Sequence, residues 1–130
     1  MSLVSIVSMV KNEEKYIESA VSSILSQNVN LELIIIDDHS EDNTLHILRK
    51  LEAQNSNLTI LVNNTVGKVN AFLQGCSHAN GDYLAFFAGD DIMPEGSLKE
   101  RLDHISRLKS PAVVLSKLRV LSEDASINGM

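Results

Sequence analysis

Blocks of apolar and polar positions alternate along the chain and predict a repeated order of strands and helices. Four runs are rich in apolar and β-branched residues, as is typical of strands buried on both faces of a parallel sheet: 3–10, 31–37, 57–62 and 83–88. The segments between them place apolar residues three and four positions apart, which predicts helices over about 12–27, 41–54 and 66–79. This alternation favours a Rossmann-like, doubly wound α/β fold with a mostly parallel sheet flanked by helices.

The last third of the chain continues the same order. Pro94 can begin the next helix, because a first helical turn does not use its missing N–H, and an apolar stripe follows at Leu98, Leu102, Ile105 and Leu108. Residues 111–121 predict a fifth strand that can continue into a hairpin. At 130 residues, with no proline-rich, glycine-serine or charge-block segment, the chain is expected to form one domain over 1–130 with a single core.

Two of the expected strands end in adjacent aspartates, Asp37-Asp38 and Asp90-Asp91. Two carboxylates about 4 Å apart near a protein surface repel by roughly 4 kcal/mol, so backbone N–H groups, a cation or a ligand are expected nearby. Doubly wound sheets bind ligands beyond the carboxyl ends of their strands. The turn at 11–13 also follows a strand, so we expect this turn and both aspartate pairs to meet at one rim of the sheet, outside the core.

Simpler structural roles compete with a ligand site at these aspartates. The first pair can belong to a turn before the helix at 41–54, although Ser40 already supplies an N-cap for that helix, with acidic residues in its first turn. The second pair can form a solvated turn after Gly89. Their repetition at strand ends favours a ligand. Carboxylate oxygens suit Mg²⁺ or Mn²⁺ when phosphates supply further ligands, so a metal-bound diphosphate is the expected occupant.

Composition and charge argue against other classes of protein. The formal net charge is −6 and the pI is about 5.1, which do not provide the basic surface that nucleic acids or anionic membranes require. No apolar run reaches the ~20 residues of a membrane span, and the first ten residues lack the features of a signal peptide. We therefore expect a cytoplasmic protein. The one cysteine, Cys76, allows no internal disulfide and is expected to be a buried apolar side chain.

The common nucleotide-binding and zinc motifs are absent from the sequence. No G-x-G-x-x-G follows the first strand, and no G-x-x-x-x-G-K-[ST] occurs. The four histidines, at 39, 46, 78 and 104, lack the spacing of a zinc site. Gly67 and Lys68 open a predicted helix, where a helix N-terminus and an ammonium group could meet a phosphate. An ordinary loop glycine beside an exposed lysine explains this pair equally well.

Three segments together resemble the family 2 glycosyltransferases of the GT-A fold, which use nucleotide-diphospho-sugars. VSIVSMVKNEEKYIESAVSSILSQ (4–27) matches the first strand and N-E turn, IIIDDHSEDNT (34–44) the D-D-x-S-x-D-x-T segment, and NGDYLAFFAGDDIMP (80–94) the G-[DE]-Y-[IL]-x-F-x-D-x-D-D block. The resemblance covers residues 3 to about 100. It implies the N-terminal, nucleotide-sugar-binding part of a longer enzyme, with the fold cut after about the fifth strand.

Carried over by position, the resemblance implies a donor site. Asp38 would hydrogen-bond the base, most often uracil, in a pocket framed by residues 10–13. Asp90 would be the metal-binding aspartate of the D-x-D motif, with Mg²⁺ or Mn²⁺, and Asp91 would add ribose contacts or support the metal ligand. With the lysine that opens the third helix, the nucleotide-binding set becomes Val10, Lys11, Glu13, Asp38, Lys68, Asp90 and Asp91, of which Asp90 is the metal ligand.

The chain departs from the family pattern at three positions. Ala88 replaces the first aspartate of D-x-D, Lys11 stands where an aromatic side chain often lies against the base, and Leu73 stands where the third helix often has asparagine. These departures bear on the choice and affinity of the nucleotide more than on the fold.

The resemblance also implies an inverting sugar transfer to a glycan or a lipid-linked acceptor, as in polysaccharide biosynthesis. A general base would deprotonate the acceptor hydroxyl while the metal stabilises the departing diphosphate. That base is expected beyond residue 130, so this chain alone is expected to be incomplete for catalysis, and the full-length protein could sit at the inner face of the membrane. Two alternatives stay open: a non-catalytic nucleotide-sugar-binding module, and a receiver-type Mg²⁺-binding signalling domain.

Overall fold

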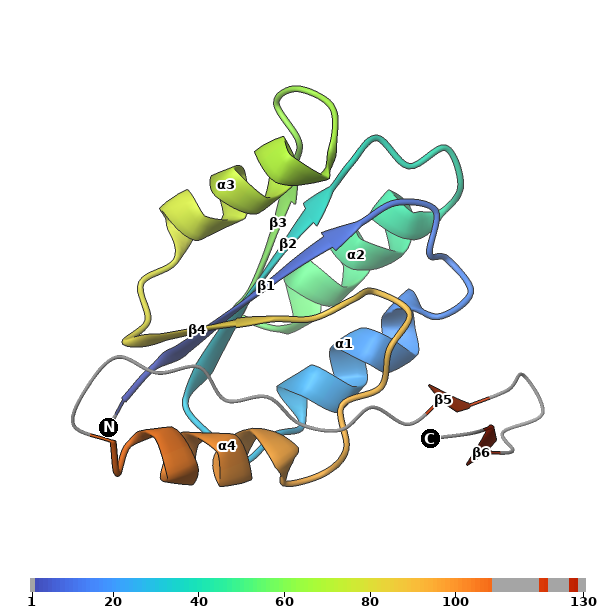
Figure 1. Ribbon diagram of the computed structural model, residues 1–130. Helices are drawn as coiled ribbons and strands as arrows, with labels where there is room; N and C mark the ends of the chain where they lie inside the picture. Colours follow the sequence, from blue (N-terminus) through green and yellow to red (C-terminus); the bar gives the residue numbers. More distant parts are fainter. Residues whose placement is uncertain (1, 109–119, 122–126, 129–130) are drawn as a thin grey trace. The chain divides into compact units, whose positions relative to one another are not determined.

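The computed structural model describes residues 2–108, 120–121 and 127–128, which fall into two compact units, 1–99 and 100–130. The first unit contains four strands, β1 (Val4–Val10), β2 (Leu31–Asp37), β3 (Leu58–Val62) and β4 (Tyr83–Phe86). Three helices connect them: α1 (Ile17–Leu25), α2 (Thr44–Gln54) and α3 (Lys68–His78). The α/β alternation that the sequence predicts is therefore confirmed (Figure 1).

The four strands form one parallel sheet in the order β3-β2-β1-β4. The chain moves outward from β1 through β2 to β3 and then returns to the other side of β1 for β4. This reversal creates a topological switch point between β1 and β4, where doubly wound folds bind their ligands. The order also excludes a receiver domain, in which the third strand lies beside the first and not beside the second.

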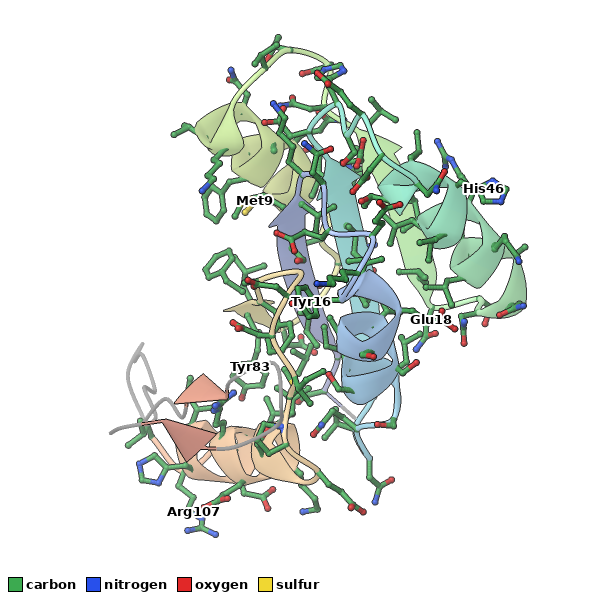
Figure 2. The ribbon with its side chains drawn as sticks, turned by 90° about the vertical axis from the view of Figure 1, so that its right-hand side faces the viewer. Met9, Tyr16, Glu18, His46, Tyr83 and Arg107 are labelled. Atoms are coloured by element: carbon green, nitrogen blue, oxygen red, sulfur yellow. The ribbon has the colours of Figure 1, made fainter. Side chains whose placement is uncertain are left out.

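Helices cover both faces of the sheet, as Figures 1 and 2 show. On one face, α3 packs through Ala71 against Val7, Ile34 and Ile36, and Met9 packs against the same cluster. Gly75 permits this close approach, because a Cβ there would lie 2.5 Å from side-chain carbons of Val7 and Ile36. On the other face, α1 buries one stripe of residues at helical spacing, Ile17, Ala20, Val21 and Ile24.

Two helices begin later than the sequence predicts, and tertiary contacts explain the difference. The α1 helix begins at Ile17 and not near Asn12, and α2 begins at Thr44 and not at Glu41. The backbone N–H of Asn12 donates to Ser40 Oγ (2.9 Å), and the N–H of Glu41 donates to Asn12 Oδ1 (2.8 Å). These hydrogen bonds join the loop before α1 to the loop before α2, so the Ser40 hydroxyl is used between the loops and does not cap a helix. The prediction that Ser40 caps α2 is therefore wrong.

The segment after β4 also differs from the expectation. The strand stops at Phe86 and not at Ala88, and α4 (Ser97–Ile105) begins three residues after Pro94, whose carbonyl accepts a hydrogen bond from the Ser97 N–H (3.1 Å). Of the predicted stripe on α4, Leu98 is buried. Cys76 is only half-buried, and burial still raises the pKa of its thiol.

Most of the predicted fifth strand, 111–119, lies outside the described residues. In the second unit, β5 (Val120–Leu121) pairs antiparallel with β6 (Ile127–Asn128), which agrees with the predicted continuation into a hairpin. Within the described part of the chain, no helix combines the length and apolar character that crossing a membrane requires.

Candidate functional site

The carboxyl ends of the strands come together at one edge of the first unit. The N–H of Asp38, after β2, donates to Val10 O at the end of β1 (2.8 Å), and the N–H of Asn63, after β3, donates to Asp37 O (2.9 Å). The loop after β4 lies at the same edge. Its residue Asp90 is close enough to Glu13, in the turn after β1, for the Asp90 charge to contribute to a raised pKa of Glu13. The structure thus brings together the residues that the sequence placed at one rim.

The two aspartates that follow β2 have different environments. Asp37 is 1% exposed, and its carboxylate accepts hydrogen bonds from the backbone N–H of Ser40 (3.0 Å) and from Ser40 Oγ. This aspartate and Ser40 therefore shape the turn at 37–40. A role in the turn before the next helix, the alternative to a ligand site, therefore applies to Asp37 but not to Asp38.

Asp38 points into a network at the start of α3. Its Oδ1 accepts hydrogen bonds from Asn63 Nδ2 (2.9 Å) and from the backbone N–H of Gly67 (3.2 Å). The Asn63 bond is the main cause of a lowered pKa of the Asp38 carboxyl, and the positive charge of Lys11 contributes. Asp38 is only 8% exposed, which corrects the expectation of a carboxylate outside the core. It is a buried, ionised hydrogen-bond acceptor.

Glu13, Asp90 and Asp91 form an acidic group at the other end of the rim. Burial raises the pKa of Glu13, and the negative charges of Asp90, Asp42 and Asp91 raise it further. The pKa of Asp91 is raised by burial and by Asp90. Such carboxylates repel one another and would be stabilised by a cation. Within the described residues, no three acidic, histidine or cysteine side chains are placed to hold a metal by themselves, so ligand oxygens would have to complete any coordination.

The acidic loop is held in place by Ser23 of α1 and by Gln27, just beyond the end of this helix. The amide of Gln27, 6% exposed, donates to the carbonyls of Met93 (3.4 Å) and Pro94 (3.0 Å) and accepts from the N–H of Leu98 (3.3 Å). Ser23 Oγ accepts from the Met93 N–H (2.9 Å). Sequence reasoning missed both polar residues, because nothing in their spacing distinguishes them from exposed positions of a helix.

Val10 and Gly89 bring the acidic loop against the end of β1. A Cβ on Gly89 would lie 2.5 Å from Val10 Cγ1, so only glycine allows this approach. Val10 is 3% exposed. Its side chain therefore supports the loop that carries Asp90, while its carbonyl holds the backbone of Asp38.

A cavity of about 340 Å³, open to solvent, lies at the switch point, where the ends of β1 and β4 meet the start of α3. Its lining combines apolar and charged side chains: Met9, Phe86, Phe87, Ala88, Lys68 and Asp91. The small side chain of Ala88, where the family pattern has aspartate, is part of this lining. Leu73 is not part of it and is 57% exposed on α3. One basic residue, Lys68, and one acidic residue, Asp91, thus line the same cavity, which suits a ligand that carries both negative charge and a metal ion.

Comparison with known proteins identifies relatives of this chain. The model of glycosyl transferase family 2 matches residues 5–128. The chain is 35% identical over 123 residues to a putative glycosyltransferase EpsE of Bacillus subtilis, covering 92% of this chain and 44% of that protein. It is 31% identical over 114 residues to a dolichyl N-acetyl-alpha-D-glucosaminyl phosphate 3-beta-D-2,3-diacetamido-2,3-dideoxy-beta-D-glucuronosyltransferase of Methanococcus voltae, covering 84% of this chain and 36% of that protein.

Solved structures share the fold. TarS 1-349 of S. aureus, in complex with UDP, superimposes with a TM-score of 0.73 at 23% identity, over 97% of this chain and 43% of that chain. The mannosyltransferase PcManGT of Pyrobaculum calidifontis, in complex with GDP-Man and Mn²⁺, superimposes with a TM-score of 0.72 at 23% identity, over 85% and 33%. The chain thus spans less than half the length of each of these proteins.

Proposed function

Because this chain belongs to glycosyl transferase family 2, we propose that it forms the donor-binding part of an enzyme that transfers a sugar from a nucleotide-diphospho-sugar. The observation that carries the proposal is the meeting of Asp38, Lys68 and the Asp90–Asp91 loop at the switch point of the sheet. In such a donor, the buried acceptor Asp38 suits the base, Lys68 at the start of α3 suits the diphosphate, and the pair Asp90–Asp91 suits the metal ion.

Asp38 recognises the base in this proposal. Its lowered pKa keeps it ionised, so it only accepts hydrogen bonds and favours a base that presents a ring N–H on its pairing edge. Uracil and guanine have such a group. The neighbouring structures that contain UDP and GDP-Man support a donor of this class, and the family resemblance favours UDP. Lys11 and Val10 complete this end of the site.

Asp90 binds a divalent cation in this proposal, with Asp91 and Glu13 beside it. Burial, and then repulsion from neighbouring carboxylates, raises the pKa of Glu13 and of Asp91, and a cation would relieve this repulsion; the carboxylates are too few for a full coordination shell without ligand oxygens. A bound Mg²⁺ or Mn²⁺ would neutralise charge on the departing diphosphate. Lys68, at the first position of α3, lines the cavity together with Asp91 and would contact the same diphosphate.

In this proposal the acceptor is a glycan or lipid-linked molecule, and no residue of this chain is assigned as the general base. The chain covers 36% and 44% of the length of the two relatives, and its residues are proposed for the donor side of the reaction. An inverting transfer, in which a carboxylate deprotonates the acceptor hydroxyl, follows from the family resemblance.

Calorimetry with UDP, GDP and ADP, each with Mn²⁺ and with EDTA, tests this proposal. We expect UDP to bind weakly in EDTA and more tightly with Mn²⁺, and ADP to bind least, because adenine has no ring N–H on its pairing edge. If none of the three nucleotides binds under either condition, the proposal is wrong. Equal affinities with Mn²⁺ and EDTA would remove Asp90 as the metal ligand.

A further inference from the structure

We propose that Asn63 is a positioning residue of the nucleotide site, which orients the carboxylate of Asp38 and joins it to the first turn of α3. The inference rests on the proposed function, in which Asp38 binds the base. Asn63 belongs to none of the motifs on which the family resemblance rests; the structure alone places it beneath the site.

The side chain of Asn63 is held by hydrogen bonds on every polar atom. It is 2% exposed. Its Nδ2 donates to Asp38 Oδ1 (2.9 Å) and to Gly67 O (3.1 Å), and its Oδ1 accepts from the Thr65 N–H (3.1 Å). A side-chain amide has two N–H donors, and both are used here. The amide therefore has one orientation available, and it presents an N–H to Asp38.

The bonds to Asp38 leave one carboxylate oxygen for a ligand. Among the described residues, the two hydrogen bonds of this carboxylate, from Asn63 and from the Gly67 N–H, both end on Oδ1. They set the torsion of the carboxylate and leave Oδ2 as the oxygen with acceptor capacity. Asn63 thus decides which oxygen meets the base and in which direction it points.

The same network reaches the diphosphate side of the site. The Gly67 N–H donates to Asp38, and the Gly67 carbonyl accepts from Asn63. The backbone of Gly67 has a φ of +104°, which favours glycine. The next residue, Lys68, lines the cavity. The position of this lysine is therefore tied through one glycine to the carboxylate that reads the base.

A first experiment measures the effect on Asp38 without any ligand. The carboxyl titration of Asp38 is followed by NMR in ¹³C-labelled protein, for the unmodified chain, Asn63→Ala and Asn64→Ala. The cations that remain near Asp38, Lys11 and His39, are unchanged in all three. We expect the pKa of Asp38 to rise in Asn63→Ala and to stay constant in Asn64→Ala, whose side chain is exposed. An unchanged pKa in Asn63→Ala would overturn the inference.

A second experiment measures recognition of the base. The probes are UDP and 3-methyl-UDP, in which the uracil N–H is replaced, and the readout is the ratio of their dissociation constants. We expect a ratio of about ten or more for the unmodified chain, since tenfold corresponds to 1.4 kcal/mol and a bond to a charged group is worth about that much. The ratio should fall several-fold in Asn63→Ala and remain unchanged in Asn64→Ala. A merely structural asparagine would weaken both probes equally.

One further variant and two outcomes separate failure of the inference from failure of the proposed function. Asn63→Asp keeps the shape of the side chain and the acceptor for Thr65 but places a second carboxylate beside Asp38, so it should reduce the ratio even if Asn63→Ala does not fold. If the unmodified chain binds UDP and both variants keep its ratio, the inference is wrong and the proposed function stands. If the unmodified chain binds neither UDP nor GDP, the proposed function is wrong, and the inference fails with it.

Discussion

The side-chain amide of Gln27 donates a hydrogen bond to the carbonyl of Pro94 at 3.0 Å, across 67 residues of sequence. Gln27 lies just beyond the end of α1, and Pro94 lies in the loop that follows the acidic pair. This contact, together with Ser23 and Met93 (2.9 Å), ties that loop to a helix packed on the sheet. The position of Asp90 and Asp91 is thus set by polar contacts outside the acidic motif.

Replacing Gln27 by Ala should destabilise the fold and loosen the acidic loop. The change leaves the carbonyls of Met93 and Pro94 and the Leu98 N–H without their partner in buried or partly buried positions, which should lower the free energy of unfolding by about 1 to 3 kcal/mol. Urea unfolding measures this loss. Gln54→Ala, at the exposed end of α2, is the matched control and should change little. Equal stability of the two variants would show that the contact does not hold the loop.

Replacing Asp38 by Ala should weaken nucleotide binding with and without metal. Loss of a hydrogen bond from the base to a charged acceptor should cost roughly 1.5 to 3 kcal/mol of binding free energy. Stability should also fall, because the Asn63 amide and the Gly67 N–H lose their acceptor in a buried place. Calorimetry with UDP in EDTA measures the first effect and thermal unfolding the second. Glu41→Ala, exposed in the same loop, is the control for both. Undiminished affinity for UDP would remove Asp38 from the site.

Replacing Asp90 by Ala should affect only the metal-dependent part of nucleotide binding. The exposed side chain makes no contribution to the core, and its removal reduces the repulsion on Glu13 and Asp91. We therefore expect unchanged affinity for UDP in EDTA, no gain on adding Mn²⁺, and an equal or slightly higher melting temperature. Calorimetry and differential scanning fluorimetry check these outcomes. A Mn²⁺-dependent gain that survives the substitution would point to other ligands.

Stability should fall in acid, and Glu32 should account for part of the loss. Burial opposes its ionisation, but hydrogen bonds from Ser5 and Asn80 prevail and lower its pKa below the usual 4.5. A lowered pKa in the folded state gives stability that is fully present above about pH 4.5 and is lost as the pH falls through the folded-state value. Glu32→Gln should therefore be less stable than the unmodified chain at pH 7, and its melting temperature should depend less on pH below 4.5.

Glu95→Gln, exposed in the loop after β4, is the control for this pH dependence and should follow the unmodified chain. If Glu32→Gln loses as much stability between pH 5 and pH 3 as the unmodified chain does, Glu32 is not a source of the acid sensitivity. The Asp38 carboxyl should contribute a similar loss at still lower pH, since its pKa is lowered from 3.8.

The pattern of residues along the chain predicted the order of the elements and the edge of the sheet that carries the candidate site. Strands such as Leu31–Asp37 are decided locally, because a run of β-branched and apolar side chains is stable only when buried on both faces of a sheet. Parallel strands connected by helices then place all carboxyl ends at one edge, which predicts that Asp38 and Asp90 lie at the same edge of the sheet.

The tertiary structure alone decided where the helices begin and what each polar residue does. The start of α1 depends on bonds between Asn12 and the segment at 40–41, which lie 28 and 29 residues apart. The role of Asn63 depends on Asp38, 25 residues away, and the role of Gln27 depends on partners 67 and 71 residues away. Such contacts leave no periodic trace, because a single side-chain amide can satisfy them from any element that the fold brings near. The sequence therefore indicated the carboxylates of the candidate site, and the structure revealed the amides of Asn63 and Gln27 that hold them or their loop in place.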